Sequence, residues 1–255
     1  MKNITKRHQF ILERLKDKGQ ITIPELIDQT KVSGVTIRKD LKFLEDKGLI
    51  FITRGGASLT NPYTIDRPII EKETINAAQK KKIARAALKL IGQNDAVIIG
   101  SGTTAFELAR QLHPAIPLTV ITPAIKITME LCDRPNVEVL QLGGIIRTNS
   151  SSVAGSYAEY MLDRVSCGVL FIGVDGIDLG FGFSISNLTE ANINQRMINA
   201  SQVVVVLADS SKFGKRGIGK ICELDHVQYV ITDDGIPETM VKELEEQGLK
   251  VIIAK

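Results

Sequence analysis

Apolar residues at the start of the chain recur at helical spacing, between residues that typically begin or end helices. Thr5 can cap a helix that runs to about Lys18 and stops at Gly19. The side chains expected on its core-facing side are Phe10, Ile11 and Leu15. The pattern therefore predicts a first helix of about three and a half turns, followed by a short extended piece at Ile21.

A second and a third helix are predicted from the same kinds of signal. Residues 22–25, Thr-Ile-Pro-Glu, have the spacing of a capping box with proline in the first turn, and the short helix that they open ends near Thr30. After a turn at Lys31-Val32, Ser33 can cap a helix that runs to Lys47 and stops at Gly48. Two helices joined by a tight turn predict a helix-turn-helix.

The third helix has an apolar stripe on one side and a basic, polar surface on the other. At 100° per residue, Ile37, Leu41 and Leu44 fall within about 60° of one another and should face the core. Such a helix fits the major groove of duplex DNA, where its N-terminal half reaches base edges and phosphates. An extended run and a Gly55-Gly56 turn follow, which predicts a β-wing. The candidate DNA-binding residues are Ser33, Val35, Thr36, Arg38, Lys39, Lys42 and Arg54.

Beyond about residue 76, apolar runs of strand length alternate with amphipathic helical stretches. The predicted strands are 96–99, 118–121, 137–142, 169–174, 203–207, 229–232 and 251–254, and the predicted helices are 79–91, 104–112, 158–164, 190–200 and 238–247. Continuous apolar strands that alternate with helices favour a parallel sheet covered on both faces. We therefore expect an α/β fold: an N-terminal winged helix-turn-helix followed by a C-terminal, mainly parallel α/β sheet domain.

Loops that follow four of these strands carry glycine, hydroxyl or charged residues. Ligands of parallel α/β sheets bind beyond the carboxyl ends of the strands. A glycine-rich turn that opens a helix suits phosphate, while cations can add to that grip and carboxylates can bind hydroxyls. The loops together predict a site for a small polyol phosphate. The candidate effector-binding residues are Ser101, Gly102, Thr103, Thr104, Gly143, Gly144, Arg147, Asp175 and Lys212.

The charge distribution distinguishes the two parts of the chain. Residues 1–57 hold 12 Lys and Arg against 7 Asp and Glu, whereas residues 58–255 hold 20 against 22. A basic head on a near-neutral body is typical of nucleic-acid binding by the head. We expect a DNA-binding domain at 1–57, a proline-containing linker at 58–75 and an effector domain at 76–255.

Composition and cysteine usage exclude several classes of protein. No apolar run approaches the roughly 18 residues of a membrane-spanning helix, and the first residues lack the apolar stretch of a signal peptide. We therefore expect a cytoplasmic protein with no membrane partner. Cys132, Cys167 and Cys222 stand far apart, and the three histidines are scattered, so no disulfide, metal site or cofactor is predicted.

The head resembles the DeoR/GlpR family of bacterial sugar-catabolism regulators. Residues 32–41, Val-Ser-Gly-Val-Thr-Ile-Arg-Lys-Asp-Leu, and the later Gly-Gly-Ala at 55–57 are similar to the family's V-S-x-x-T-I-R-R-D-L and R-x-H-G-G-A. Lys39 replaces the second arginine of the first motif. Ile52 and Arg54 stand where the wing usually has arginine and histidine.

The body extends this resemblance to nearly the whole chain. Its matching segments are 101–104, 142–144, 155, 173–177, 187 with 190–191, 197–198 and 207–214. The resemblance implies an effector domain similar to ribose-5-phosphate and glucosamine-6-phosphate isomerases, a phosphorylated sugar as effector, a homo-oligomer and repression of a carbohydrate uptake or catabolism operon. Gly100 and Pro123 replace the family's usual aspartate and asparagine, which points to an unusual sugar beside an intact phosphate loop.

Two other functions fit parts of the pattern. A sugar-phosphate isomerase with a DNA-binding head would need a carboxylate base and an acid, for which Asp175, Asp178, Glu190 and Lys212 are available. A sensor whose head binds protein rather than DNA is the other alternative. Nucleotide hydrolysis is disfavoured, because residues 214–220 resemble a P-loop but Ile221 stands where the magnesium-binding hydroxyl is needed.

Overall fold

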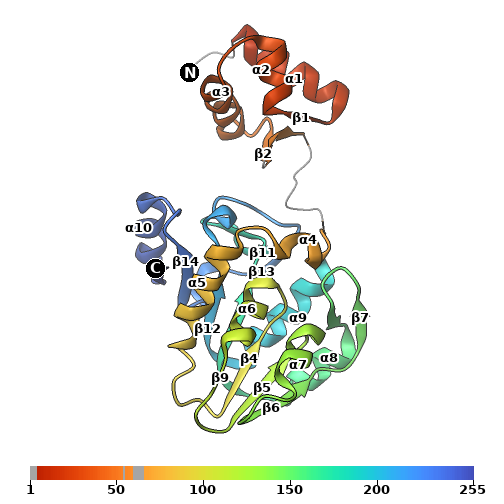
Figure 1. Cartoon of the computed structure of the whole chain (residues 1–255), viewed down its shortest axis with the longest axis vertical. Coiled ribbons are helices and arrows are strands. Elements are labelled where there is room, and N and C mark those ends of the chain that lie inside the picture. Colours follow the sequence, from red (N-terminus) through yellow and green to blue (C-terminus); the bar gives the residue numbers. More distant parts are fainter. Residues whose placement is uncertain (1–4, 54, 60–65) are drawn as a thin grey trace. The chain divides into compact units, whose positions relative to one another are not determined.

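The computed structural model describes residues 5–53, 55–59 and 66–255 of the chain. The chain divides into two compact units, residues 1–65 and 66–255 (Figure 1). Each unit has its own apolar core, so each is described by itself. Candidate residue Arg54 lies outside the described residues.

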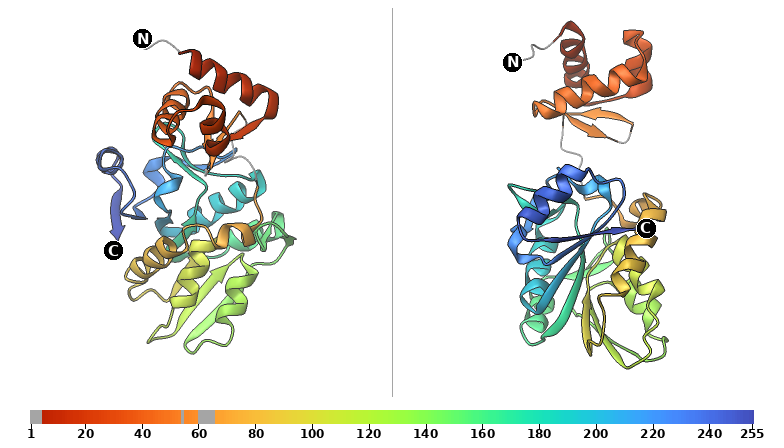
Figure 2. Two further views of the ribbon diagram at one scale, coloured as in Figure 1. Left: turned by 45° about the horizontal axis from the view of Figure 1, so that its top comes forward. Right: turned by 90° about the vertical axis from the view of Figure 1, so that its left-hand side faces the viewer.

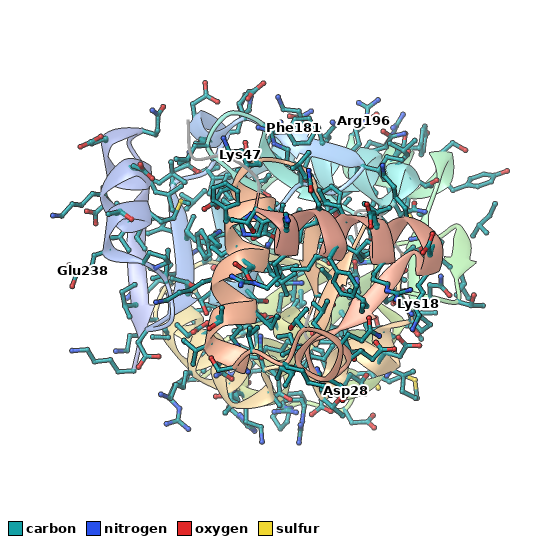
Figure 3. The ribbon with its side chains drawn as sticks, turned by 90° about the horizontal axis from the view of Figure 1, so that it is seen from above. Lys18, Asp28, Lys47, Phe181, Arg196 and Glu238 are labelled. Atoms are coloured by element: carbon teal, nitrogen blue, oxygen red, sulfur yellow. The ribbon has the colours of Figure 1, made fainter. Side chains whose placement is uncertain are left out.

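The first unit is a three-helix bundle with a small antiparallel sheet. Its elements are α1 (Lys6–Lys18), β1 (Gln20–Thr22), α2 (Ile23–Thr30), α3 (Gly34–Asp46), β2 (Phe51–Thr53) and β3 (Gly56–Ser58). The strands follow the order β1-β3-β2, which forms the predicted wing. Figure 3 shows Lys18 at the end of α1, Asp28 on α2 and Lys47 at the end of α3.

Side-chain hydrogen bonds begin all three helices, as the sequence predicts. The hydroxyls of Thr5, Thr22 and Ser33 accept from backbone N–H groups three residues later. The predicted stripe of α3 lies in the core, because Ile37, Leu41 and Leu44 are at most 1% exposed. Phe10, in contrast, is only half-buried.

The second unit contains a seven-stranded, fully parallel sheet, which confirms the predicted α/β fold. Its strands are β4 (Ala96–Ile99), β5 (Leu118–Thr122), β6 (Val137–Gln141), β9 (Cys167–Gly173), β12 (Ser201–Leu207), β14 (Tyr229–Asp233) and β15 (Lys250–Ala254). The order in the sheet is β15-β14-β12-β9-β4-β5-β6. Strands β9 and β4 therefore lie in the middle, and β6 forms one edge.

Helices cover both faces of this sheet (Figure 2). One face packs against α5 (Ala77–Leu88), α6 (Thr103–Gln111) and α7 (Ile125–Leu131), through residues such as Ile83, Leu108 and Ile127. The other packs against α8 (Ser156–Leu162), α9 (Leu188–Asn199) and α10 (Glu238–Glu246). Helices on both faces explain why the strands are apolar at consecutive positions rather than at alternate ones.

Short elements that the sequence does not predict are inserted along the chain between strands of the main sheet. They are the hairpin β7 (Ile145–Arg147) and β8 (Ser152–Ala154), the sheet of β10 (Gly176–Asp178), β11 (Gly182–Ile185) and β13 (Gly219–Cys222), and the 3-10 turns η1 (Ser210–Lys212) and η2 (Leu224–His226). The P-loop-like residues 214–220 lead into strand β13 rather than into a helix.

The segment that the sequence assigns to a linker is partly structured. Residues from Asp66 onward belong to the second unit, and Ile69–Glu73 form a short helix, α4. Distant partners hold it in place: Glu73 pairs with Lys126, and the backbone N–H of Ile69 donates to Asn149 O at 2.6 Å. We call residues 66–75 the strap.

Candidate functional site

The exposed side of α3 carries the predicted DNA-binding residues of the first unit. Val35 is 62% exposed, and Arg38 and Lys39 are exposed as well. Ser33 and Thr36 are hydrogen-bonded to each other, since Ser33 Oγ lies 3.0 Å from Thr36 Oγ1. The structure thus brings six of the seven predicted residues onto one helix and its cap.

Lysines 39 and 42 differ in their surroundings. Lys42 Nζ lies 3.0 Å from Asp46 Oδ1 and 3.4 Å from Glu45 Oε2. The hydrogen bond to Asp46 raises the pKa of Lys42. Within the part of the chain that the structure describes, no ion pair involves Lys39. A phosphate must therefore compete with carboxylates for Lys42 but not for Lys39.

A buried carboxylate, which the sequence does not single out, fixes α3 to α1. Asp40 is 6% exposed and accepts hydrogen bonds from two nitrogens of Arg7, one of them at 2.9 Å. It also lies 3.0 Å from His8 Nε2. His8 Nδ1 accepts from the Thr5 backbone N–H, so Nε2 carries the proton and donates to Asp40. Burial would raise the pKa of Asp40, but Arg7 and His8 outweigh it and lower that pKa.

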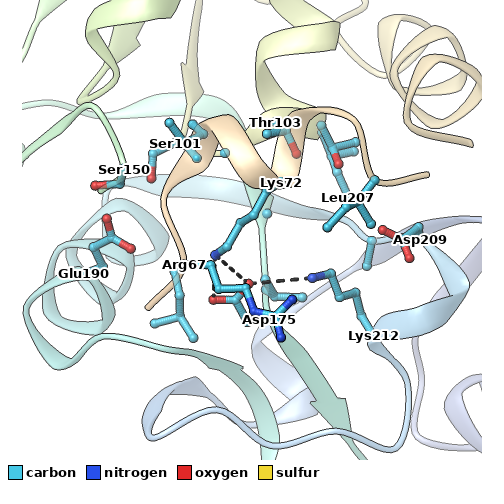
Figure 4. A pocket seen from close by; sticks show the side chains of 18 of the residues that line it. Arg67, Lys72, Ser101, Thr103, Ser150, Asp175, Glu190, Leu207, Asp209 and Lys212 are labelled. Atoms are coloured by element: carbon cyan, nitrogen blue, oxygen red, sulfur yellow. Dashed lines mark hydrogen bonds and ion pairs between the residues drawn. The ribbon is translucent and has the colours of Figure 1, made fainter. Parts of the chain in front are cut away.

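The second unit has a cavity at the carboxyl ends of β4, β9 and β12 (Figure 4). Its walls come from the loop Ser101–Thr104, from Gly173 to Asp175, from Leu207 to Asp209 with Lys212, and from the strap. Its volume is about 100 Å³, smaller than the roughly 300–1,000 Å³ of most small-molecule pockets. A ligand larger than this volume would therefore require the side chains that cross the cavity to move.

The loop after β4 presents hydrogen-bond donors to this cavity. Gly102 has φ +121°, a conformation that favours glycine, and it caps α6 without a side-chain hydrogen bond. The first backbone N–H groups of a helix have no partners within it, so this turn can surround an anion. The hydroxyls of Ser101, Thr103 and Thr104 stand beside them.

Asp175 is at the centre of the ionic contacts that cross the cavity. Its Oδ1 lies 3.1 Å from Lys72 Nζ and 3.6 Å from Lys212 Nζ (Figure 4). Ser186 donates to Oδ2 through Oγ at 2.8 Å and through its backbone N–H at 3.1 Å. Burial would raise the pKa of Asp175. The two lysines and Ser186 outweigh it and lower that pKa from 3.8 to about 2.

Three predicted effector-binding residues do not line the cavity. Gly144 has φ +143°, and a Cβ there would lie 2.8 Å from Val153 Cγ1, so this residue shapes the β7–β8 hairpin. The Gly143 N–H points to Met161 Sδ at 3.2 Å. Arg147 pairs with Asp66 and Glu190, which do line the cavity. Asn149 and Ser150, between β7 and β8, do line the cavity, so the turn of this hairpin reaches it and the residues that directly follow β6 do not.

Sequence reasoning also missed residues that reach the cavity. Asp66, Arg67, Ile69 and Lys72 come from the strap, for which the sequence offers no signal beyond Pro68. Asp209 stands two residues beyond the end of β12 and accepts from Asn76 Nδ2 at 2.8 Å.

Metal ligation and membrane insertion find no support in the described residues. No group of three or more His, Cys, Asp or Glu among them is placed to hold a metal ion. Within the described ranges, no helix is both long and apolar enough to cross a bilayer. The three cysteines are free thiols.

Comparisons with known proteins match both units. Residues 7–62 match the DeoR-like helix-turn-helix domain, and residues 75–234 match the DeoR C-terminal sensor domain. A putative aga operon transcriptional repressor of Escherichia coli O157:H7 is 35% identical over 98% of this chain and 93% of its own. An L-fucose operon activator of Haemophilus influenzae is 28% identical over 97% of this chain and 99% of its own.

Among solved structures, the ribose 5-phosphate isomerase of Methanocaldococcus jannaschii covers 54% of this chain and 55% of its own. The sequence identity is 20% and the TM-score is 0.38.

Proposed function

We propose, from the premise that this chain belongs to the DeoR family of transcriptional regulators, that it represses a carbohydrate uptake or catabolism operon and is released from DNA by a phosphorylated sugar. The sign of regulation is chosen from the relative at 35% identity, which is named a repressor. We further propose that the chain acts in the cytoplasm as a homo-oligomer, without a cofactor.

Operator recognition is assigned to α3. Arg38 and Lys39 stand on its exposed side, and Val35 offers an apolar contact to a thymine methyl group. Asp40 is a positioning residue, because it contacts Arg7 and His8 of α1 and lies on the buried side of α3. Arg54 of the wing is retained as a candidate backbone contact.

Sugar-phosphate recognition is assigned to the cavity. The observation that carries this proposal is the convergence of a glycine-containing helix N-terminus with Lys72 and Lys212 at the carboxyl ends of neighbouring strands. The helix N-terminus and the lysines suit phosphate, and Asp175 and Asp209 suit sugar hydroxyls. Arg147 acts indirectly, because it forms ion pairs with Asp66 and Glu190, which line the cavity.

The strap provides the route from effector to DNA-binding unit. It follows that unit along the chain through residues 60–65 and lines the cavity with Lys72. A phosphate that draws Lys72 away from Asp175 breaks an ion pair that holds the strap. Effector binding therefore weakens the attachment of the strap, which is the segment that leads to the first unit along the chain.

Catalysis is the weaker candidate, although the cavity contains carboxylates. A general base should have a pKa near the working pH. The pKa of Asp175 is about 2, and Glu190 is paired with Arg147, so neither carboxylate is suited to proton abstraction from a sugar. We propose that the bound sugar phosphate is not turned over.

The test is an operator titration of the full chain against a panel of pentose, hexose and amino-sugar phosphates, with unphosphorylated parents and inorganic phosphate as controls. One phosphorylated sugar should weaken operator binding and remain chemically unchanged. At 100 times its dissociation constant, it should stabilise the fold by about 2.7 kcal/mol. The sensor assignment is wrong if a sugar phosphate binds measurably and operator affinity does not move.

A further inference from the structure

Helix α5, which covers one face of the sheet in the second unit, is strongly basic on its outer side (Figure 1). At 100° per residue, four of its cationic positions fall within an arc of about 100°. Ile83 and Ala87 lie on the other side of the helix and are buried against the sheet. We call the outer surface the α5 stripe, and its members are Lys81, Lys82, Arg85 and Lys89, all of them exposed.

The charges of the α5 stripe are not neutralised within the part of the chain that the structure describes. Among residues 5–53, 55–59 and 66–255, no carboxylate forms an ion pair with any of its four cations. Residues 77–89 contain no Asp or Glu, whereas residues 58–76 and 90–255 together hold 15 Lys and Arg against 22 Asp and Glu. The stripe is therefore a local excess of positive charge on a unit that is otherwise acidic.

Lys80 belongs to the same run of lysines but lies on the inner side of α5. It is 5% exposed, and its Nζ donates to the backbone carbonyl of Lys72 in the strap. This lysine has a structural contact inside the unit. The stripe lysines have none, so a partner outside the unit is the remaining use for their charge.

The chemistry of the stripe favours the phosphate backbone of duplex DNA over an acidic protein surface. Protein interfaces usually have an apolar centre, whereas none of the large apolar side chains of α5 is exposed. From Lys81 to Lys89 the helix rises about 12 Å, a length over which one strand of DNA presents about three or four phosphates.

We propose that the α5 stripe binds the phosphate backbone of duplex DNA, in addition to the contacts of α3. This inference rests on the proposed function, in which the first unit holds the same DNA. Because both units belong to one chain, DNA bound by the first unit is present at a high effective concentration for the second. The stripe adds affinity that depends on salt and not on sequence, since phosphates carry no sequence information.

The experiment is a titration of the full chain with a random-sequence duplex of about 40 base pairs, at salt concentrations from about 50 to about 200 mM. In Lys82→Gln/Arg85→Gln two phosphate contacts are lost, so the slope of log affinity against log salt should fall by about 2. The rise in salt should therefore weaken the wild type about 12-fold more than the variant. Glutamine is a good helix former, and circular dichroism checks that the variant is folded.

Arg196→Gln/Lys242→Gln is the charge-matched control. It removes two exposed cations from α9 and α10, which cover the other face of the sheet. Its salt slope should equal that of the wild type. An unchanged slope in the folded α5 variant, or an equal fall in the control, would overturn the proposal. An α5 variant that loses binding to poly-glutamate while its DNA slope is unchanged would assign the stripe to an acidic protein instead.

A second measurement needs no variant. Acetylation of the wild type by acetic anhydride, read by mass spectrometry, should show that the duplex protects Lys82 and Lys89 but not Lys242. Equal labelling of Lys82 and Lys89 with and without DNA would overturn the proposal. Arg38→Ala/Lys39→Ala is titrated on the same duplex: an unchanged slope there, beside a lower slope in the α5 variant, refutes the assignment of α3 and leaves that of the stripe.

Discussion

At the scale of single residues, charged side chains differ in whether they already form an ion pair within the protein. Arg38 and Lys39 project from α3, whereas Lys42 is held by Asp46. In the second unit, Asp175 is neutralised by two lysines while the hydroxyls of residues 101–104 face the cavity. A group with a partner must lose it before it binds a ligand, and this difference decides the size of each expected effect.

Arg38→Ala should weaken operator binding by about 1–3 kcal/mol if Arg38 reads a base, and the loss should be larger for the operator than for random DNA. Lys42→Ala should weaken all sequences alike and lower the salt slope by about 1. The measurement is a titration of each DNA at several salt concentrations. Unchanged operator binding by a folded Arg38→Ala/Lys39→Ala variant would exclude α3 as the reading helix.

Thr104→Val should weaken the bound sugar phosphate by roughly 1.5–3 kcal/mol, because one hydrogen bond to a charged group is lost. Thr104 is buried at the start of α6, and valine has nearly the same shape. Calorimetry with the sugar phosphate and its unphosphorylated parent measures the effect. Thr119→Val, on β5 and away from the cavity, serves as the control. Equal affinity of the wild type for both ligands would refute the phosphate site.

Asp175 should give the second unit a stability that depends on acid pH. Its pKa is lowered from 3.8 to about 2, so its ionised form stabilises the fold at every pH above about 4. That contribution, about 2 kcal/mol, is lost as the pH falls from about 4 to 2. Denaturant unfolding should therefore show a steeper loss in the wild type than in Asp175→Asn over this range. Parallel curves for the two proteins would contradict the assignment.

At the scale of elements, a buried carboxylate orients one helix on another. The pairs of Asp40 with Arg7 and His8 join α1 to α3, and His8 stacks on Phe43 with ring centroids 4.7 Å apart. Leaving the buried N–H of His8 without its acceptor is costly, while an exposed ion pair contributes little.

Asp40→Ala should therefore destabilise the first unit by about 1–3 kcal/mol, because the buried Nε2–H of His8 is left without an acceptor. Asp28→Ala, which breaks the exposed pair with Lys31, should cost less than about 1 kcal/mol. Urea unfolding of the full chain is measured for both variants. Hydrogen exchange of the backbone amides in α1 and α3 reports the unfolding of the first unit. A similar small loss in both would show that Asp40 does not fix α3.

At the scale of the whole molecule, regulation needs a coupling between two units with separate cores. The strap is joined to the rest of the second unit by Glu73–Lys126, a pair that does not line the cavity. Changing this pair therefore alters the attachment of the strap without altering the ligand contacts. Coupling free energies between sites are typically about 1–3 kcal/mol, or roughly 5- to 150-fold in affinity.

Lys126→Glu should reduce the factor by which the effector changes operator affinity, because two carboxylates would then face each other. The reversed pair, Glu73→Lys with Lys126→Glu, should restore that factor. Operator titrations with and without saturating effector measure it, and effector titrations with and without operator should give the same value. A factor that is unchanged in Lys126→Glu would exclude the strap as the route.

The sequence by itself determines the local elements of this protein. The caps Thr5, Thr22 and Ser33 fix where three helices begin, and continuous apolar runs fix all seven strands of the main sheet. The glycine turn before α6 is also readable, because a turn, a strand end and a helix start lie within a few residues. These features depend on neighbours along the chain, so the pattern of residues contains them.

Only the tertiary structure decides which loops meet and which charges pair. The order of the strands brings the ends of β4, β9 and β12 together and leaves Gly143 and Gly144 at an edge. Lys72 meets Asp175 across 103 residues, and Asp66 meets Arg147 across 81. Such contacts depend on how the whole chain packs, and no local pattern records them. For the same reason, Asp40 appears in the sequence as one more polar residue of α3 and in the structure as its anchor.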